Sequence, residues 1–502
     1  MPGSDADLPM GGQGPDASYS RQTVFSTITQ ALIYVSGILL TPLLFKISGP
    51  GVYGEYALLL SLAGFLFGTS TMGVGFAARR YLPSATTNAQ RIALFYPQFW
   101  GNLLIVVGVG ALILGVGGLL SRFELAHSYQ YLFLSSYLLA QVLYSQGADY
   151  LRSTHRVYAF NCVTVAQPYL YIAAVLCQFA ILGRIDLTVL LWTQVASLLL
   201  ISIYGLVRVT TEMPVSFVLP TFRQARSDLV LGGPLVLSYI MDVLLAFSDR
   251  YVIGLLIGFE GVGFYAVAYT LGSVPLFLAK ALTVALPVRL ARLIDGGNPE
   301  AAQRIVADTL RLYLFIAIPY VVGTIVLGPR IMALYASDAA AAEAIITLPV
   351  IALATVLYGI FLVFTAICIV ELRSADIFRA NAAAAVINLI LNLVVMYFVR
   401  DIAVAAFTTL AAYALILQRL MSNTSSRWFA GLSISIIART VAAALVMGIV
   451  MGLVTRFAPV HPNDIVTTLA LVAIGVLVYL LAAIASGVVT RDDMGRLVRG
   501  FR

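Results

Sequence analysis

The chain has 502 residues, of which 61% are hydrophobic and 11% charged, with a net charge of +7 and a mean hydropathy of +0.96. About a quarter of the residues in a typical soluble domain are charged, so this composition excludes a soluble globular protein of this size. Apolar runs of about 20 residues, long enough to cross about 30 Å of hydrocarbon, recur along the chain. They lack the alternation of barrel strands and therefore predict helices.

Residues 1–22 are rich in Gly, Pro, Asp and Ser. A secretory signal would begin with basic residues and become apolar within about 30 residues. We therefore predict a disordered cytoplasmic tail followed by a retained first helix.

Apolar runs bounded by charges or turn residues predict about fourteen transmembrane helices. In chain order they fall near residues 24–46, 52–78, 92–120, 128–150, 158–182, 187–207, 229–257, 261–288, 311–335, 344–370, 377–399, 402–421, 433–457 and 465–489.

Basic residues give these helices a direction. Of the 30 Lys and Arg residues, 22 fall on the side of the N-terminus, 6 on the opposite side and 2 inside helices. Cytoplasmic connections carry such an excess, so both termini are predicted to be cytoplasmic. The same bias accounts for the positive net charge without a nucleic-acid partner.

Catalytic and cofactor motifs are not found. The three cysteines, Cys162, Cys177 and Cys368, lie in apolar runs without metal-ligand spacing, and the three histidines are scattered through connections. No phosphate-binding Gly motif is present, and the connections are too short for a soluble catalytic domain. We expect a protein that is not an enzyme and has no cofactor or metal site.

An internal repeat divides the chain. Residues 46–60 (KISGPGVYGEYALLL) align with residues 255–269 (LLIGFEGVGFYAVAY) at an offset of 209, and both join the first and second helices of a half. Transporters built from such repeats place the substrate between the halves. The predicted domains are a tail at 1–22, a six-helix lobe at 23–210, a linker at 211–228, a second lobe at 229–422, two extra helices at 430–490 and a tail at 491–502.

These motifs carry a family resemblance. The segments GPGVYGEYALLLSL, GVGFAARRYLP (residues 73–83) and SDRYVIGLLIGFEGVGFYAVAY resemble Wzx-type, O-antigen-like polysaccharide flippases. These belong to the multidrug/oligosaccharidyl-lipid/polysaccharide (MOP) exporter superfamily. The resemblance implies an all-α polytopic protein of the bacterial inner membrane, with two pseudo-symmetric six-helix lobes plus two C-terminal helices.

The same resemblance implies a function. It implies a central cavity, alternating access and a polyprenyl-pyrophosphate-linked oligosaccharide as cargo for surface polysaccharide assembly. The two extra helices are implied to hold the lipid tail. The implied partners are the lipid-linked glycan and membrane lipids, together with a polysaccharide polymerase and glycosyltransferases.

Ionisable residues inside membrane helices are costly and are candidates for function. Asp242 and Asp249 are seven residues apart on one helix face, whereas Arg250 points about 100° away from Asp249. Asp242 is expected to line the cavity. Asp249 and Arg250 fit a cavity role or a purely structural role equally.

Three further cations extend the list. Lys280 either faces the pyrophosphate or extends its side chain to the cytoplasmic surface. Arg79 and Arg80 end the second helix as cytoplasmic anchors, and either could also contact a phosphate at the cavity mouth.

Uncharged polar stripes suggest a hydrated interior. Gln30 and Tyr34 share one face of the first helix, and Asn388 and Asn392 share a face of the eleventh with Asn381. Such residues also occur at ordinary contacts between membrane helices, so each stripe has two explanations.

Three other functions compete. A multidrug/cation antiporter of the same superfamily normally has twelve helices and an acidic cavity, whereas this chain has two more helices and interior cations. A lipid II flippase shares the helix count but tends to carry more cavity arginines. A membrane glycosyltransferase would need larger connecting loops.

Overall fold

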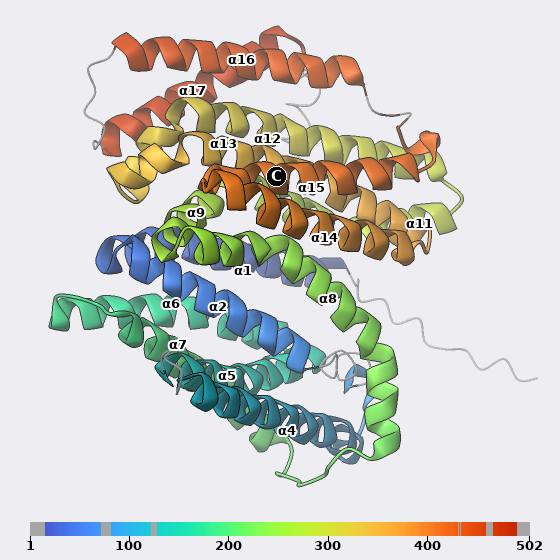
Figure 1. Ribbon diagram of the computed structural model, residues 1–502. Helices are drawn as coiled ribbons and strands as arrows, with labels where there is room; N and C mark the ends of the chain where they lie inside the picture. The colour runs from blue at the N-terminus through green and yellow to red at the C-terminus, as the bar shows by residue number, and fades with distance from the viewer. Residues whose placement is uncertain are drawn as a thin grey trace, which may run out of the picture.

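Every element in the described part of the protein is a helix (Figure 1). The computed structural model describes residues 16–71, 82–121, 128–429, 431, 433–457 and 465–488. The elements are α1 (Asp16–Ser48), α2 (Pro50–Ser70), η1 (Leu82–Ser84), α4 (Asn88–Ser121), α5 (Ser128–Ser153), α6 (Val157–Leu182), α7 (Leu187–Glu212), α8 (Phe222–Leu256), α9 (Phe259–Gly272), α10 (Val274–Thr283), α11 (Leu286–Asp295), α12 (Pro299–Tyr335), α13 (Asp338–Val370), α14 (Ser374–Val399), α15 (Ile402–Ser422), η2 (Ser426–Phe429), α16 (Ile434–Phe457) and α17 (Ile465–Ala485).

Twelve helical segments in the described ranges are long and apolar enough to cross a membrane, so the all-α polytopic fold is confirmed. The helices α5 and α8, with 26 and 35 residues, are also long enough, but each contains polar and charged residues that lower its hydropathy. Together with the twelve, they make the fourteen helices that the sequence predicts. That α5 and α8 also cross the membrane stays a prediction.

Several helix boundaries differ from those expected; α12, for example, begins at Pro299 and not near residue 311. The helix predicted at 261–288 is divided at Ser273 into α9 and α10, and α10 begins with Pro275 in its first turn, where the missing N–H costs least. The first helix begins at Asp16, inside the predicted tail 1–22. Hydropathy locates the part of a helix that lies in lipid and misses its extension into water. Residues 1–15 and 491–502 of the predicted tails lie outside the described residues.

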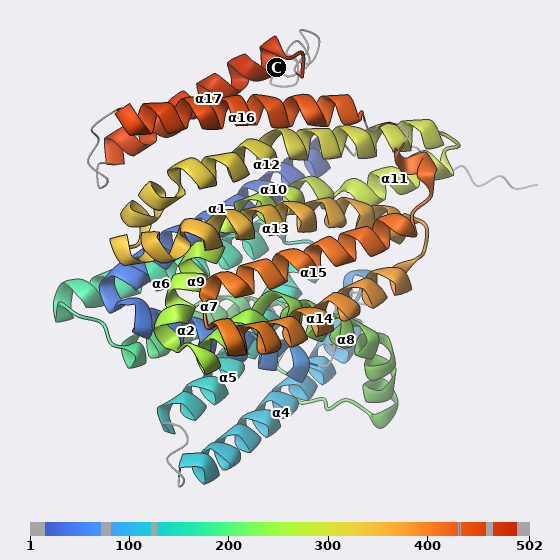
Figure 2. The same ribbon diagram turned by 45° about the horizontal axis from the view of Figure 1, so that its top comes forward.

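The helices form two neighbouring groups. The first group contains α1, α2 and α4–α7, the second contains α8–α15, and α16 and α17 pack against α12 at the edge of the second (Figure 1). Figure 2 shows the same outer position of α16 and α17 in a turned view. The domain boundaries given above remain a prediction, and these contacts agree with them.

Backbone geometry repeats between the groups. Gly49 and Gly258, which the offset of 209 aligns, both have positive φ angles, 84° and 116°, and both precede a helix. Glycine adopts such angles without steric cost, so the repeated motif encodes the same turn twice.

A second repeat was not visible in the sequence. His155 and Leu372 are non-glycine residues with φ of 59° and 57°, and each lies just before an arginine, Arg156 or Arg373. Both arginine N–H groups donate to the carbonyl five residues earlier, at 2.9 and 2.7 Å. These are the same helix-ending turn, and they extend the repeat to the junctions α5–α6 and α13–α14.

Candidate functional site

Polar side chains join α8 to α14 at two successive levels. Asp242 and Asn381 meet at one level, and Ser248 and Asn388 meet at the next, about two turns further along both helices. We call these the open level and the buried level, because their exposure to solvent differs.

The open level contains a carboxylate, and an ammonium group lies near enough to act on it electrostatically. Asp242 Oδ1 accepts a hydrogen bond from Asn381 Nδ2 at 2.9 Å. Lys280, on α10, attracts Asp242 electrostatically, and both side chains are exposed. Asp242 lies 14 residues, or about 21 Å, from the end of α8. Charges facing lipid at this depth would cost several kcal/mol, so their exposure indicates a water-accessible space.

Lys280 has no ion-pair partner in this space. Among the described residues, no carboxylate oxygen lies within 4.0 Å of its Nζ. Ser273, Phe277 and Lys280 recur on one side of α10, and Tyr34 of α1 contacts the first two. Lys280 therefore lies on the side of α10 that faces the first helix group.

Tyr34 also connects the groups, about two turns from Lys280 along α10. Its hydroxyl lies 3.1 Å from Ser273 Oγ, and its ring stacks on Phe277 with centroids 4.3 Å apart and planes at 21°. Gln30, one turn away on α1, is exposed. Arg79 and Arg80 lie outside the described residues.

At the buried level Asp249 is enclosed. Its side chain is 1% exposed. One carboxylate oxygen accepts a hydrogen bond from the Tyr265 hydroxyl, and the other accepts one from the Arg250 backbone N–H at 2.8 Å. The bond from Tyr265 joins α9 to α8, and the bond from Arg250 lies within α8.

Asn388 and Asn392 complete this level and are fully buried. Asn388 Oδ1 accepts hydrogen bonds from Ser248 at 3.0 Å and from Asn392 at 3.1 Å. Thr408 of α15 donates to Asn392 Oδ1 at 2.6 Å. In this conformation the two asparagines join α8, α14 and α15 and do not line an exposed surface.

Arg250 points away from its neighbour, as the helix geometry predicts. No ion pair within 4.0 Å joins its side chain to Asp249 in the described part of the chain. Its guanidinium lies over the rings of Phe247 and Tyr269, at 4.9 and 5.2 Å from their centroids. Its buried Nε has no hydrogen-bond partner. Cation–π contacts thus replace an ion pair here.

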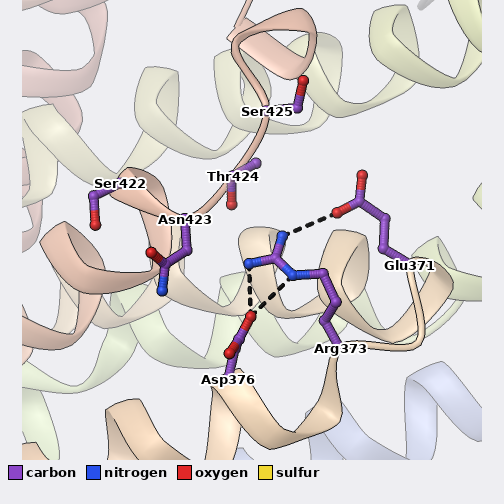
Figure 3. Close-up of a pocket in the computed structure, with 7 residues that line it drawn as sticks. All are labelled: Glu371, Arg373, Asp376, Ser422, Asn423, Thr424 and Ser425. Carbon is purple, nitrogen blue, oxygen red and sulfur yellow. Dashed lines mark hydrogen bonds and ion pairs between the residues drawn. The ribbon is translucent and has the colours of Figure 1, made fainter.

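A charged cluster at the junctions α13–α14 and α15–α16 was missed by the sequence analysis (Figure 3). Glu371 accepts hydrogen bonds from Arg373 at 3.1 Å, Arg427 at 2.8 Å and Trp428 Nε1 at 2.9 Å. Arg373 also holds Asp376 with two bonds, at 2.9 and 2.7 Å. Glu371 and Arg427 are 56 residues apart in sequence, so no local motif marks the whole cluster.

In this cluster the opposite charges are paired with one another. Burial raises the pKa of Glu371, but the bonds from Trp428, Arg427 and Arg373 outweigh burial and leave the pKa below its ordinary value. The carboxylate is therefore ionised at neutral pH. It fastens the connection leading to α16 onto the second helix group.

The fold, with its two helix groups, is that of a transporter of the MOP exporter superfamily. Within that class, the chain belongs to the polysaccharide biosynthesis protein family, whose sequence profile matches residues 20–291. The MatE profile also matches, over residues 234–397. No curated protein sequence shows significant similarity to the chain.

Solved structures support the same fold. The lipid II flippase MurJ in an inward closed conformation is 15% identical with a TM-score of 0.71, over 92% of this chain and 98% of that one. An inward-facing multidrug resistance MATE family transporter is 14% identical with a TM-score of 0.63, over 79% and 95%. A MOP superfamily transporter from Pyrococcus furiosus is 14% identical with a TM-score of 0.55, over 81% and 96%. At these identities the likeness defines the fold alone.

Proposed function

We propose that this flippase moves a polyprenyl-pyrophosphate-linked oligosaccharide across the bacterial inner membrane by alternating access, for surface polysaccharide assembly. The observation that carries the proposal is Lys280, an exposed ammonium group on the side of α10 that faces the other helix group, with no ion-pair partner among the described residues. An unpaired cation in a hydrated membrane space favours an anionic cargo. Family membership supports a polysaccharide-related cargo.

The distribution of carboxylates argues against a cation antiporter. A cavity for cationic cargo needs accessible negative charge, but Asp249 is buried under Tyr265. Asp242 is accessible, yet Asn381 donates to it and Lys280 attracts it. Asp249 is therefore enclosed, and the hydrogen bond from Asn381 together with the nearby positive charge makes Asp242 a poor site for a cation.

A lipid II flippase is the second candidate, because the match to MurJ extends over nearly the whole chain. Lipid II and lipid-linked repeat units share the pyrophosphate and the polyprenyl tail, so Lys280 could attract the pyrophosphate of either cargo. The sugars distinguish the two cargoes. The choice between them rests here on the family's link to polysaccharide biosynthesis.

Location and partners follow from the same proposal. Both termini face the cytoplasm, where glycosyltransferases build the lipid-linked unit, and a polymerase uses it on the other side. The chain contains no phosphate-binding Gly motif, so we propose that an ion gradient or consumption of the product drives the movement.

A deletion strain tests the proposal. We expect the strain to lose its surface polysaccharide and to accumulate the lipid-linked repeat unit in the cytoplasmic leaflet, with the wild-type gene restoring both. Continued export without any trapped repeat unit would refute the proposed cargo. Arrest of peptidoglycan synthesis in the deletion strain would favour lipid II.

A further inference from the structure

The two helix groups touch backbone to backbone where α2 crosses α9. A Cβ atom added to Gly54 would lie 1.8 Å from the carbonyl oxygen of Phe259, and one added to Gly263 would lie 2.2 Å from that of Pro50. Real Cβ atoms do not approach other atoms so closely. Only hydrogen fits at both positions, so glycine is required on each side of the crossing.

The crossing is symmetric between the repeats. The offset of 209 aligns Gly54 with Gly263 and Pro50 with Phe259. Gly54 therefore contacts Phe259, and Gly263 makes the equivalent contact with Pro50. This reciprocity is the property of a twofold interface, here formed within one chain.

Hydrogen bonds between the groups gather at the same end of the bundle, which charge predicts to face outward. They join Thr41 to Thr270 at 3.4 Å, Ser61 to Tyr251 at 3.1 Å and Tyr335 to the carbonyl of Ile38 at 2.7 Å. Lys46 donates to the carbonyl of Leu334 at this end. A further bond, from Tyr239 to the carbonyl of Gly64, lies deeper in the bundle, beyond Asp242 along α8.

The opposite end is joined differently. Among the described residues, no hydrogen bond joins the N-terminal half of α1 to the second group. That half instead bonds to α6, through Ser26 with Asn161 and through the carbonyl of Leu32 with Tyr169. In the described part of the chain, the bonds between the groups therefore lie toward the outer end and the middle of the bundle.

We propose that the crossing at Gly54 and Gly263, called the glycine seal, is the outer gate of the transport path. It separates when the outer end opens and re-forms when that end closes. Contact between small residues acts over a short range, so a slight separation removes it and allows water to enter. This gate belongs to the proposed transport cycle and rests on the proposed function.

A reversible crosslink provides the first test. In a chain whose three native cysteines are replaced by alanine, Thr41→Cys and Thr270→Cys place two thiols at positions whose hydroxyl oxygens are 3.4 Å apart. Oxidation should join α1 to α9 and stop polysaccharide export, and reduction should restore it. Full export by a chain shown to be crosslinked would overturn the proposal.

The closing test reads the seal without any substrate, so its result is independent of the proposed cargo. Ser61→Cys places a thiol between the groups, at a position that is 8% exposed. A membrane-impermeant thiol reagent added outside should label this thiol at least about tenfold faster when Gly54→Ala or Gly263→Ala is added, because the added methyl group clashes with the facing carbonyl oxygen and shifts the equilibrium away from the closed seal.

Gly51→Ala is the matched control. It lies on α2 one turn before Gly54, and a Cβ there meets nothing within 4 Å. We expect labelling at the rate of the unchanged seal. Equal labelling in folded Gly54→Ala, Gly263→Ala and Gly51→Ala proteins would overturn the proposal.

Discussion

The open and buried levels contain similar residues on the same two helices but in opposite environments. At the buried level Asp249 and Asn388 are enclosed, and their bonds hold α8, α9, α14 and α15 together. At the open level Asp242 and Lys280 are exposed, and Lys280 has no ion-pair partner in the described part of the chain. Polar residues inside a membrane protein thus divide into those that hold helices together and those left free for a ligand.

The largest expected effect is at the open level. Lys280→Ala should lower export by about tenfold to a hundredfold, since a lost bond to a charged group costs about 1.5–3 kcal/mol. Protein abundance in the membrane should stay normal. Export is measured as surface polysaccharide per cell.

Arg379→Ala is the matched control for charge, since this side chain is 70% exposed at the start of α14. It should export normally. Equal loss in both variants, or normal export by Lys280→Ala, would remove Lys280 from the site.

The second effect is at the buried level. Asn388→Ala removes the acceptor for Ser248 and Asn392 and should lower the free energy of unfolding by about 1–3 kcal/mol. Thermal unfolding in detergent measures the change. Asn381→Ala, with one bond at the open level, should unfold at a higher temperature than Asn388→Ala. The reverse order would break the distinction between the two levels.

A third prediction concerns the Glu371 cluster, whose paired charges lie at the junctions between helices. Glu371→Gln should lower stability by about 1 kcal/mol, because Arg373 and Arg427 lose their charged acceptor. The depressed pKa of Glu371 means that its contribution is present above the ordinary value of 4.5 and is lost as the pH falls through the lower, folded-state pKa.

Unfolding temperatures of the wild type and of Glu371→Gln, followed from pH 7 downward, provide the measurement. The two curves should converge as the pH falls below the ordinary pKa. A gap that stays constant with pH would show that the ionised carboxylate is not what fastens the cluster.

The smallest effect is expected from Tyr34→Phe. The stack on Phe277 remains and only the bond to Ser273 is lost, a change of about 0.5–1.5 kcal/mol. Export should fall less than in Lys280→Ala. The loss of export in Tyr34→Ala should be larger than in Tyr34→Phe and smaller than in Lys280→Ala. A loss as large as that of Lys280→Ala would assign Tyr34 a direct contact with cargo.

The sequence predicted the helices well and their interior less well. Apolar length is a local property, so the membrane segments and the repeated glycine turn were accessible from the sequence. The three asparagines of α14 were correctly placed on one face. Whether a residue on that face is enclosed, like Asn388, or joins an exposed carboxylate, like Asn381, depends on α8 and α15, which are distant in sequence.

The same limit explains the unexpected features. The turns at His155 and Leu372 are not marked by glycine, and the Glu371 cluster joins residues from two distant connections. Each depends on packing between segments, which the hydropathy of a single segment does not report.

The most direct test of the proposed function is a flipping measurement with purified protein. Liposomes containing a polyprenyl-pyrophosphate-linked oligosaccharide in both leaflets are treated with a membrane-impermeant glycosidase, which digests only the outer glycan. The proposal predicts that wild-type protein makes the inner-leaflet glycan digestible and that Lys280→Ala does not. Digestion confined to the outer leaflet by a wild-type protein that transports a cationic dye would contradict it.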